Sequence, residues 1–268
     1  MNVAEHVHAA SEKQKRGGGK PIEQRFVEYL EHLAGLGVTA SGEAGERETN
    51  RAALAQLRRT LGKNPNEAVD GFRYVTRWVE DALSVKGLQP YSPKAEWCEE
   101  CFYLVAALFA FYQTGEPRAS WHHEESPLRD RNFGASFLKL EAVQAGDAPQ
   151  AEGTGKERAK NLERRFTALL VSRQSDLPQR LRHAVSLLKS ENVPVDWVQL
   201  LVDLQKWRSG EGVPYRVGDK ASVQRRWAKS FWRVEAIDHT PTAEMNKADD
   251  LNEVDGNETG LKTEEDEN

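Results

Sequence analysis

Apolar and polar positions along the chain alternate at helical spacing. In residues 22–37 (IEQRFVEYLEHLAGLG), Ile22, Phe26, Leu30 and Leu33 recur every three or four positions, so they share one face of a helix. Similar stripes predict helices over residues 51–62, 68–83, 132–140, 157–173, 176–190, 194–207 and from residue 219 onward. No convincing strand alternation or repeat of fixed period occurs. We therefore predict an all-α fold.

Several segments carry more specific expectations. Residues 95–115 (AEWCEECFYLVAALFAFYQTG) are apolar nearly all round, which predicts a central buried helix. Phe72, Val75 and Val79 are expected to share one buried stripe. Asp176 is expected to cap its helix, with Pro178 in the first turn. Residues 142–157, rich in Ala, Gly and Pro, are expected to form a loop.

These elements predict two small helical bundles with disordered ends. We expect a disordered extension at residues 1–20, an N-terminal helical domain at 21–116, a connector at 117–131, a basic C-terminal helical bundle at 132–236 and a disordered acidic tail at 237–268.

The segment KASVQRRWAKSFW, residues 220–232, mixes aromatic and cationic side chains. Placed on a helix, Val223, Trp227 and Phe231 fall on one narrow arc with Val234, which predicts a core face. A second arc collects the cations Arg225, Arg226, Lys229 and Arg233. Trp232 lies off the core face, where it is suited to stack on a base, pack on an arginine or anchor a protein partner.

The net charge of −5 hides a segregated distribution. Residues 237–268 hold 11 acids and 2 lysines, whereas residues 154–236 hold 17 Lys or Arg against 9 Asp or Glu. Such asymmetry points to a polyanionic partner, although a solvated basic face is an equally ordinary explanation.

Other features narrow the class of protein. The longest apolar segment, residues 101–112, is shorter than the roughly 20 residues that span a membrane, and the N-terminus has no apolar signal core. We therefore expect a cytoplasmic protein. Cys98 and Cys101, with His122 and His123 downstream, offer four possible zinc ligands. Buried cysteines one helical turn apart fit a hydrophobic role better, so no metal or other cofactor is expected. No catalytic motif is found, and we expect no enzymatic activity.

The C-terminal half resembles the CasB family, the small subunit of the type I-E CRISPR surveillance complex Cascade. The resemblance rests on NFGASFLKL, the ERRF helix, LPQRLRHAVSLL, VPVDW and RRWAKSFW, which follow in that order over about residues 130–232. ALAQLRRTLG and the helix that ends in FYQTG agree more loosely. The N-terminal extension and the acidic tail lie outside the shared pattern.

The resemblance implies an all-helical, non-catalytic protein. It implies contacts with the backbone and large subunits of a complex that contains crRNA, with a second copy of the chain, and with single-stranded non-target DNA in an R-loop. The implied DNA contacts are Arg58, Arg59, Arg164, Arg165, Arg173, Arg182, Arg225 and Arg226. The basic stripe of residues 220–232 adds Lys229 to these candidates. Arg164 and Arg165 point about 100° apart on a helix, so one of them is expected to face elsewhere. His183 stands where the pattern has room for a second basic residue, and a strong phosphate contact is not expected there.

Two alternatives stay open at this point. In one, the arginines bind acidic groups of proteins and the chain is a scaffold subunit without direct DNA contact. In the other, the chain is a zinc-stabilised helical regulator that binds duplex DNA.

Overall fold

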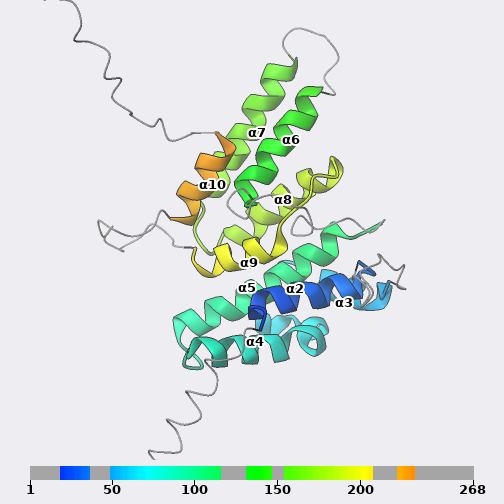
Figure 1. Ribbon diagram of the computed structural model, residues 1–268, viewed down its shortest axis with the longest axis vertical. Helices are drawn as coiled ribbons and strands as arrows, with labels where there is room; N and C mark the ends of the chain where they lie inside the picture. Colours follow the sequence, from blue (N-terminus) through cyan, green and yellow to red (C-terminus); the bar gives the residue numbers. More distant parts are fainter. Residues whose placement is uncertain (1–18, 37–48, 116–130, 147–153, 208–221, 233–268) are drawn as a thin grey trace, which may run out of the picture. The chain divides into compact units, whose positions relative to one another are not determined.

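The computed structural model describes residues 19–36, 49–115, 131–146, 154–207 and 222–232 (Figure 1). Within these ranges the chain forms nine α-helices and two short 3-10 turns and no strand, which confirms the all-α prediction. The predicted extension up to residue 18, most of the connector, and the acidic tail lie outside the described residues. The α-helices are α2 (Ile22–Leu33), α3 (Arg51–Arg59), α4 (Phe72–Lys86), α5 (Pro93–Tyr112), α6 (Phe133–Gly146), α7 (Thr154–Leu170), α8 (Leu177–Ser190), α9 (Trp197–Gln205) and α10 (Val223–Phe231), and the 3-10 turns are η2 (Pro65–Glu67) and η3 (Val69–Gly71).

Helix α5 is the buried centre of the N-terminal helices, as its apolar pattern predicts. Every residue from Cys101 to Ala110 is buried. The helix packs against α3 and α4, and also against α8 and α9 of the C-terminal half (Figure 1). The ring of Phe102 on α5 lies 4.9 Å from that of Phe26 on α2, centroid to centroid.

Three hydrogen bonds tie α5 to the C-terminal helices. The Tyr112 hydroxyl donates to the Val193 carbonyl at 2.8 Å, and the Trp97 indole N–H donates to the Leu204 carbonyl at 2.8 Å. In the reverse direction, the Lys189 ammonium, on α8, donates to the carbonyl of Phe111 at 2.9 Å. The helices that the structure describes all fall in one compact unit, residues 1–234. The predicted boundaries at 116 and 131 stay a prediction.

The C-terminal core is built from aromatic side chains of α6, α7 and α10. The ring of Phe166 lies 4.4 Å from that of Phe231 and 4.9 Å from that of Phe137, centroid to centroid. Val223, Trp227 and Phe231 are all buried, as the predicted core face of the last helix requires. Val234, the fourth residue of that face, and Arg233 of the basic stripe lie outside the described residues.

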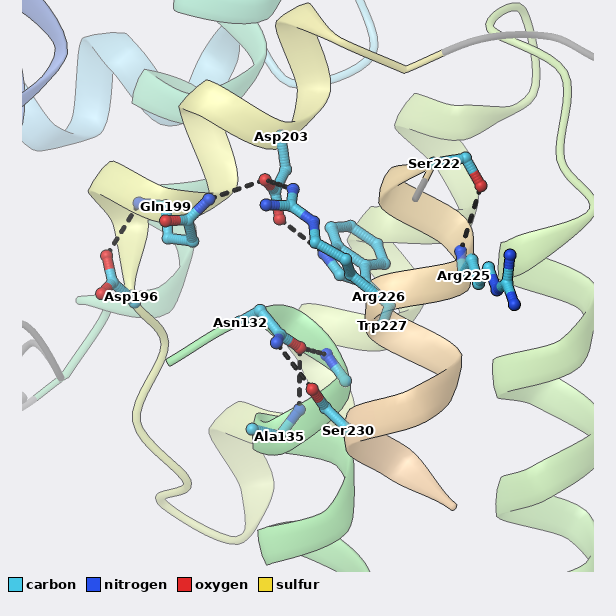
Figure 2. A network of polar contacts seen from close by, with 11 residues as sticks. Asn132, Ala135, Asp196, Gln199, Asp203, Ser222, Arg225, Arg226, Trp227 and Ser230 are labelled. Carbon is cyan, nitrogen blue, oxygen red and sulfur yellow. Dashed lines mark hydrogen bonds and ion pairs between the residues drawn. The ribbon is translucent and has the colours of Figure 1, made fainter. Parts of the chain in front are cut away.

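The start of α6 provides a close-fitting recess for α10 (Figure 2). Asn132 accepts hydrogen bonds from the backbone N–H groups of Gly134 and Ala135, at 2.9 and 3.2 Å, and its amide donates to the Ser230 hydroxyl at 2.7 Å. A Cβ placed on Gly134 would lie 2.0 Å from the backbone oxygen of Trp227. The two helices therefore touch through their backbones.

The lengths of two predicted elements are wrong. The predicted loop over residues 142–157 is helical at both ends, because α6 continues to Gly146 and α7 begins at Thr154. Alanine has the highest helix propensity, and Val143 packs against the core, so the pattern that suggested a loop extends the helix instead. The last helix, expected from residue 219, is described from Val223, where the Ser222 hydroxyl accepts from the Arg225 N–H at 3.3 Å. Residues 219–221 lie outside the described residues.

Two predicted side-chain roles also differ. Phe72 is 41% exposed as the first residue of α4, where its ring meets Tyr103 edge-on, whereas Val75 and Val79 are buried as expected. Asp176 does precede α8, with Pro178 in the first turn, but its carboxylate makes no capping hydrogen bond.

Candidate nucleic-acid interface

Positive charge gathers on α7, α8 and α10. Residues 157–190 hold eight Lys or Arg against three Asp or Glu, and residues 222–232 hold three cations and no acid. Helices α7 and α8 pack against each other, and α10 packs against α7. This part of the chain therefore has the charge that a phosphate backbone needs.

Arg165 of α7 meets Arg180 and His183 of α8 around one cavity of about 480 Å³. Phe137, Ala184, Ser186 and Leu187 complete the lining, and none of the lining residues is acidic. Arg165, Arg180 and His183 are all exposed. Arginine presents N–H groups in a planar fork that matches the oxygens of a phosphate, so this cavity is suited to an oxyanion.

Arg164 and Arg165 face different surroundings, as their spacing predicts. Arg165 also lines a second cavity of about 390 Å³, together with Arg158, Asn161 and the acidic Glu191. Arg164 is exposed and borders neither of these two cavities. Within this pair, only Arg165 borders the cavity that it shares with Arg180 and His183. We call this cavity between α7 and α8 the cationic groove.

Arg182 faces a different cavity, which has mixed charge. This cavity, of about 760 Å³, is lined by Lys63, Arg182 and His183 and also by Glu96 and Glu100 of α5. Burial raises the pKa of Glu100, and the nearby charges of Glu96 and Glu99 raise it further. An extended phosphate backbone meets carboxylates here, so this cavity is a poorer phosphate site than the one lined by Arg165, Arg180 and His183.

On α10, only part of the predicted basic stripe is free (Figure 2). Arg226 forms an ion pair with Asp203 of α9, whose side chain is fully buried. Asp203 also accepts from the Trp227 indole N–H at 2.6 Å and from the Gln199 amide at 2.7 Å. Arg225 is exposed beside the Ser222 cap (Figure 2), and Lys229 is exposed one turn further on.

Burial raises the pKa of Asp203 above its ordinary value of 3.8. The hydrogen bond from Trp227 and the positive charge of Arg226 act in the opposite direction and do not fully offset burial. The guanidinium of Arg226 is thus engaged in neutralising a buried carboxylate. Its role as a DNA contact stays a prediction.

Trp232 packs within the chain. Its side chain is 41% exposed, its indole N–H donates to the Glu163 carboxylate at 3.0 Å, and its ring meets Phe166 edge-on at 5.9 Å between centroids. Among the described residues, Trp232 therefore contacts α7, and its stacking on a base, packing on an arginine or contact with a protein partner stay predictions.

The remaining predicted contacts lie apart from the groove. Arg58 and Arg59 are exposed at the end of α3, and Arg58 donates to the Thr114 hydroxyl at 3.1 Å. Arg173 is exposed in the turn between α7 and α8, where its carbonyl accepts from the N–H groups of Asp176 and Leu177. The structure thus unites one predicted arginine, Arg165, with residues that were not predicted.

Sequence reasoning missed Arg180 and gave His183 no strong role. A signal was present, since residues three apart share one face of a helix. Arg180 and His183 therefore point together, whereas Arg182 points away from Arg180. That this face meets Arg165 depends on how α7 and α8 pack.

The two cysteines lie inside α5. Cys98 and Cys101 are free and buried, and burial raises the pKa of both thiols, that of Cys101 to well above its ordinary value of 9.0. Zinc binds thiolates, and these surroundings favour protonated thiols that pack as hydrophobic groups. Among the described residues no group of three or more His, Cys, Asp or Glu is arranged to hold a metal ion. His122 and His123 lie outside those residues.

A family profile matches the part of the chain that forms most of these helices, and this match identifies the family. The profile of the family described as CRISPR-associated protein Cse2 matches residues 53–232. The chain belongs to this family. The matched residues include most of α3 and all of α4 to α10, while α2 precedes them.

Individual proteins and solved structures match most of the chain. CRISPR-associated protein Cse2 of Thermus thermophilus is 26% identical over 225 residues, which cover 83% of this chain and 96% of that protein. The crystal structure of M. ruber CasB is 27% identical with a TM-score of 0.51, over 80% of this chain and 94% of CasB. A chain from a CRISPR RNA-guided surveillance complex is 22% identical with a TM-score of 0.49, over 80% and 94% of the two chains. The resemblance to the CasB family seen in the sequence is confirmed.

Among the residues that the structure describes, no helix combines the length and the apolar character needed to cross a membrane.

Proposed function

We propose that this Cse2 protein is the small subunit of a type I-E CRISPR surveillance complex and that it steadies unwound target DNA, above all the displaced non-target strand. The observation that carries the proposal is the cavity where Arg165, Arg180 and His183 converge without a carboxylate in its lining. Arg225 and Lys229, both exposed, extend the proposed contact onto α10.

The chemistry of these residues suits a sequence-tolerant role. Arginine and lysine hold phosphates and carry no sequence information in doing so, and an RNA-guided complex leaves sequence reading to base pairing. Exchange of a DNA duplex for an RNA–DNA heteroduplex is nearly balanced in free energy. A modest number of backbone contacts on the displaced strand is therefore enough to shift it.

The proposal includes a non-catalytic role, because holding a displaced strand requires no bond to be made or broken. It also includes the partners and the cytoplasmic location expected from the sequence: the crRNA-containing complex, its backbone and large subunits, and a second copy of this chain.

The test is single-strand and duplex DNA binding by the full chain across a salt series. The variant Arg165→Glu with Arg180→Glu is compared with a control, Arg51→Glu with Lys94→Glu, which makes the same charge change at exposed residues of α3 and α5. We expect salt-sensitive, sequence-tolerant binding that only the first variant loses. Each lost phosphate contact lowers the log–log salt slope by about 0.7 on a single strand.

The same variants are then compared in the reconstituted complex. We expect Arg165→Glu with Arg180→Glu to shorten the lifetime of the R-loop while crRNA binding is retained. An unchanged R-loop lifetime would contradict the DNA role. Loss of assembly with unchanged DNA affinity of the isolated chain would favour the scaffold function instead.

A further inference from the structure

A second arginine cluster lies on α2 and α4, away from the cationic groove. The guanidinium of Arg77 lies 4.6 Å from the ring centroid of Trp78 and 5.5 Å from that of Tyr29. Arg25 of α2 lies 5.7 Å from the same Trp78 ring, and the Tyr29 and Trp78 rings are 5.4 Å apart. Arg73, one turn before Arg77, lies over Tyr74 at 5.1 Å. We call Arg25, Tyr29, Arg73, Arg77 and Trp78 the α2–α4 cluster.

The cluster is rich in hydrogen-bond donors and poor in acceptors. Arg25, Arg73 and Arg77 are exposed, and none of them forms an ion pair with a carboxylate of the described residues. The indole N–H of Trp78 is buried without an acceptor. Burial raises the pKa of Tyr29, and the charges of Arg77 and Arg73 act in the opposite direction. A guanidinium only donates, so an occupant must supply acceptors.

The charge of the residues around the cluster distinguishes two kinds of acceptor, the phosphates of a polyanion and the carboxylates of a protein. Residues 19–36 and 65–88, which include α2 and α4, hold five Lys or Arg against seven Asp or Glu. Exposed Glu80 and Asp81 follow Arg77 within about one turn of α4. A continuous polyanion would be repelled by these carboxylates, in contrast to the groove between α7 and α8. A single carboxylate that pairs with one guanidinium brings one charge to the surface, so it meets less of this repulsion than a continuous polyanion does.

The composition of the cluster also fits a protein partner. Trp, Tyr and Arg are enriched among residues that dominate binding energy at protein interfaces. A guanidinium already stacked on a ring loses less freedom when it binds, so the surface is pre-organised. Trp78 is only 5% exposed, which leaves little of its ring for a nucleic-acid base to stack on.

We propose that the α2–α4 cluster is a docking surface for a carboxylate-bearing segment of a partner protein, with Arg25 and Arg77 as the anchoring cations. Helix α2, which carries two of the five residues of the cluster, precedes the residues matched by the Cse2 family profile. The inference rests on the proposed function in one respect: the partner is sought among the proteins of the same complex.

The first test measures how tightly the full chain joins a reconstituted complex that lacks it. We expect Arg77→Ala to weaken this binding about 30-fold, as for an interface anchor, and Arg25→Glu with Arg77→Glu to abolish it. Arg77→Lys should also weaken it, because an ammonium cannot bind a carboxylate in a bidentate manner. The control Arg51→Glu should bind normally. Thermal melting and single-strand DNA binding of the isolated variants should match the unaltered chain.

The second test identifies the acceptor. Arg77→Lys places an amine in the cluster, and a zero-length carbodiimide reagent joins amines to carboxylates in direct contact. We expect mass spectrometry to find a cross-link from position 77 to an Asp or Glu of another subunit, and Arg51→Lys to give none. Cross-links only to Glu80 or Asp81 of the same chain would overturn the proposal, as would unchanged incorporation of the double charge reversal. An equal loss of isolated-chain DNA binding would assign the cluster to nucleic acid instead.

The two proposals fail separately. The docking surface alone is overturned if the Arg25 and Arg77 variants assemble normally while the Arg165 and Arg180 changes still shorten the lifetime of the R-loop. The DNA role alone is overturned if the Arg25 and Arg77 variants assemble poorly while the Arg165 and Arg180 changes leave the lifetime of the R-loop unchanged.

Discussion

The carboxylate of Asp203 on α9 accepts a hydrogen bond from the indole N–H of Trp227 on α10 at 2.6 Å, and neither side chain is exposed to solvent. Asp203 is the one acidic group among the contacts that hold α10 in Figure 2. We expect Asp203→Ala to lower the free energy of unfolding by about 1–3 kcal/mol, because it leaves the buried indole N–H of Trp227 without its acceptor, while Arg226, 43% exposed, stays within reach of water. Urea denaturation measures this. Asp81→Ala, at an exposed carboxylate of α4, should change stability by less than about 0.5 kcal/mol, and an equal loss in both variants would contradict the anchoring role.

The same carboxylate predicts a pH dependence. Its folded-state pKa lies above the ordinary 3.8, so in the window from 3.8 up to the folded value the native state binds more protons than the unfolded state. Its contribution to stability is therefore full below pH 3.8 and falls as the pH rises through the folded pKa. Asp203→Asn removes the titration. As the pH rises across this window, the unaltered chain should lose stability relative to Asp203→Asn, and above the window the difference between the two should stay constant. If the unaltered chain instead gained stability relative to Asp203→Asn as the pH rose, the folded-state pKa of Asp203 would be lowered.

The cations of α10 should divide into two classes. Arg225 and Lys229 are exposed, so Arg225→Glu with Lys229→Glu should weaken single-strand DNA binding and leave the melting temperature unchanged. Arg226→Ala removes the partner of a buried carboxylate and should lower the melting temperature. Fluorescence anisotropy and thermal melting on the same samples separate the two effects. If Arg226→Ala melted normally and lost DNA binding, its ion pair would be incidental.

Gly134→Ala should displace α10. The new Cβ would meet backbone atoms of Trp227 at 2.0, 2.7 and 2.8 Å, and backbone cannot rotate aside as a side chain can. Overpacking of this kind costs about 1–3 kcal/mol or more. Gly146→Ala at the other end of α6 is the matched control, since a Cβ there meets nothing within 4 Å, and it should be neutral or mildly stabilising. Similar melting of the two variants would show that the recess is loose.

The cysteines should be inert in the folded protein. The thiolate is the reactive form, and burial holds the pKa of both Cys98 and Cys101 above the ordinary 9.0. An aromatic disulfide reagent at pH 8 should label neither residue until denaturant is added, and then both. Rapid labelling of the native chain would contradict the buried positions.

What the sequence reveals is the part of the fold that depends on local spacing. Phe26, Trp227 and Phe231 are buried, as helical periodicity requires. Arg226 shows where that reasoning stops: its spacing groups it with Arg225 and Lys229, yet Asp203, 23 residues earlier, draws it to a buried carboxylate. A lone Asp among Leu201, Val202 and Leu204 is a weak hint of such a contact, and its partner depends on how α9 and α10 pack.

The cationic groove shows the same limit. The resemblance to CasB led to Arg165 and Arg182, and the structure separates them between two cavities. Arg180 joins Arg165 because α7 and α8 pack side by side, which no spacing within one helix reveals. The α2–α4 cluster was missed because Arg25 and Arg77 are 52 positions apart and meet only over the ring of Trp78.

The recess at Asn132 and Gly134 also sets an order of events during synthesis. The amide of Asn132 bonds to a hydroxyl 98 residues further along, Ser230, and the aromatic core of α6 and α7 is completed by Phe231. On a translating ribosome, α6 and α7 emerge well before the helix that covers them. The nascent chain therefore carries the uncovered rings of Phe137 and Phe166 until α10 is released, and during this interval it is most exposed to aggregation and most dependent on chaperones.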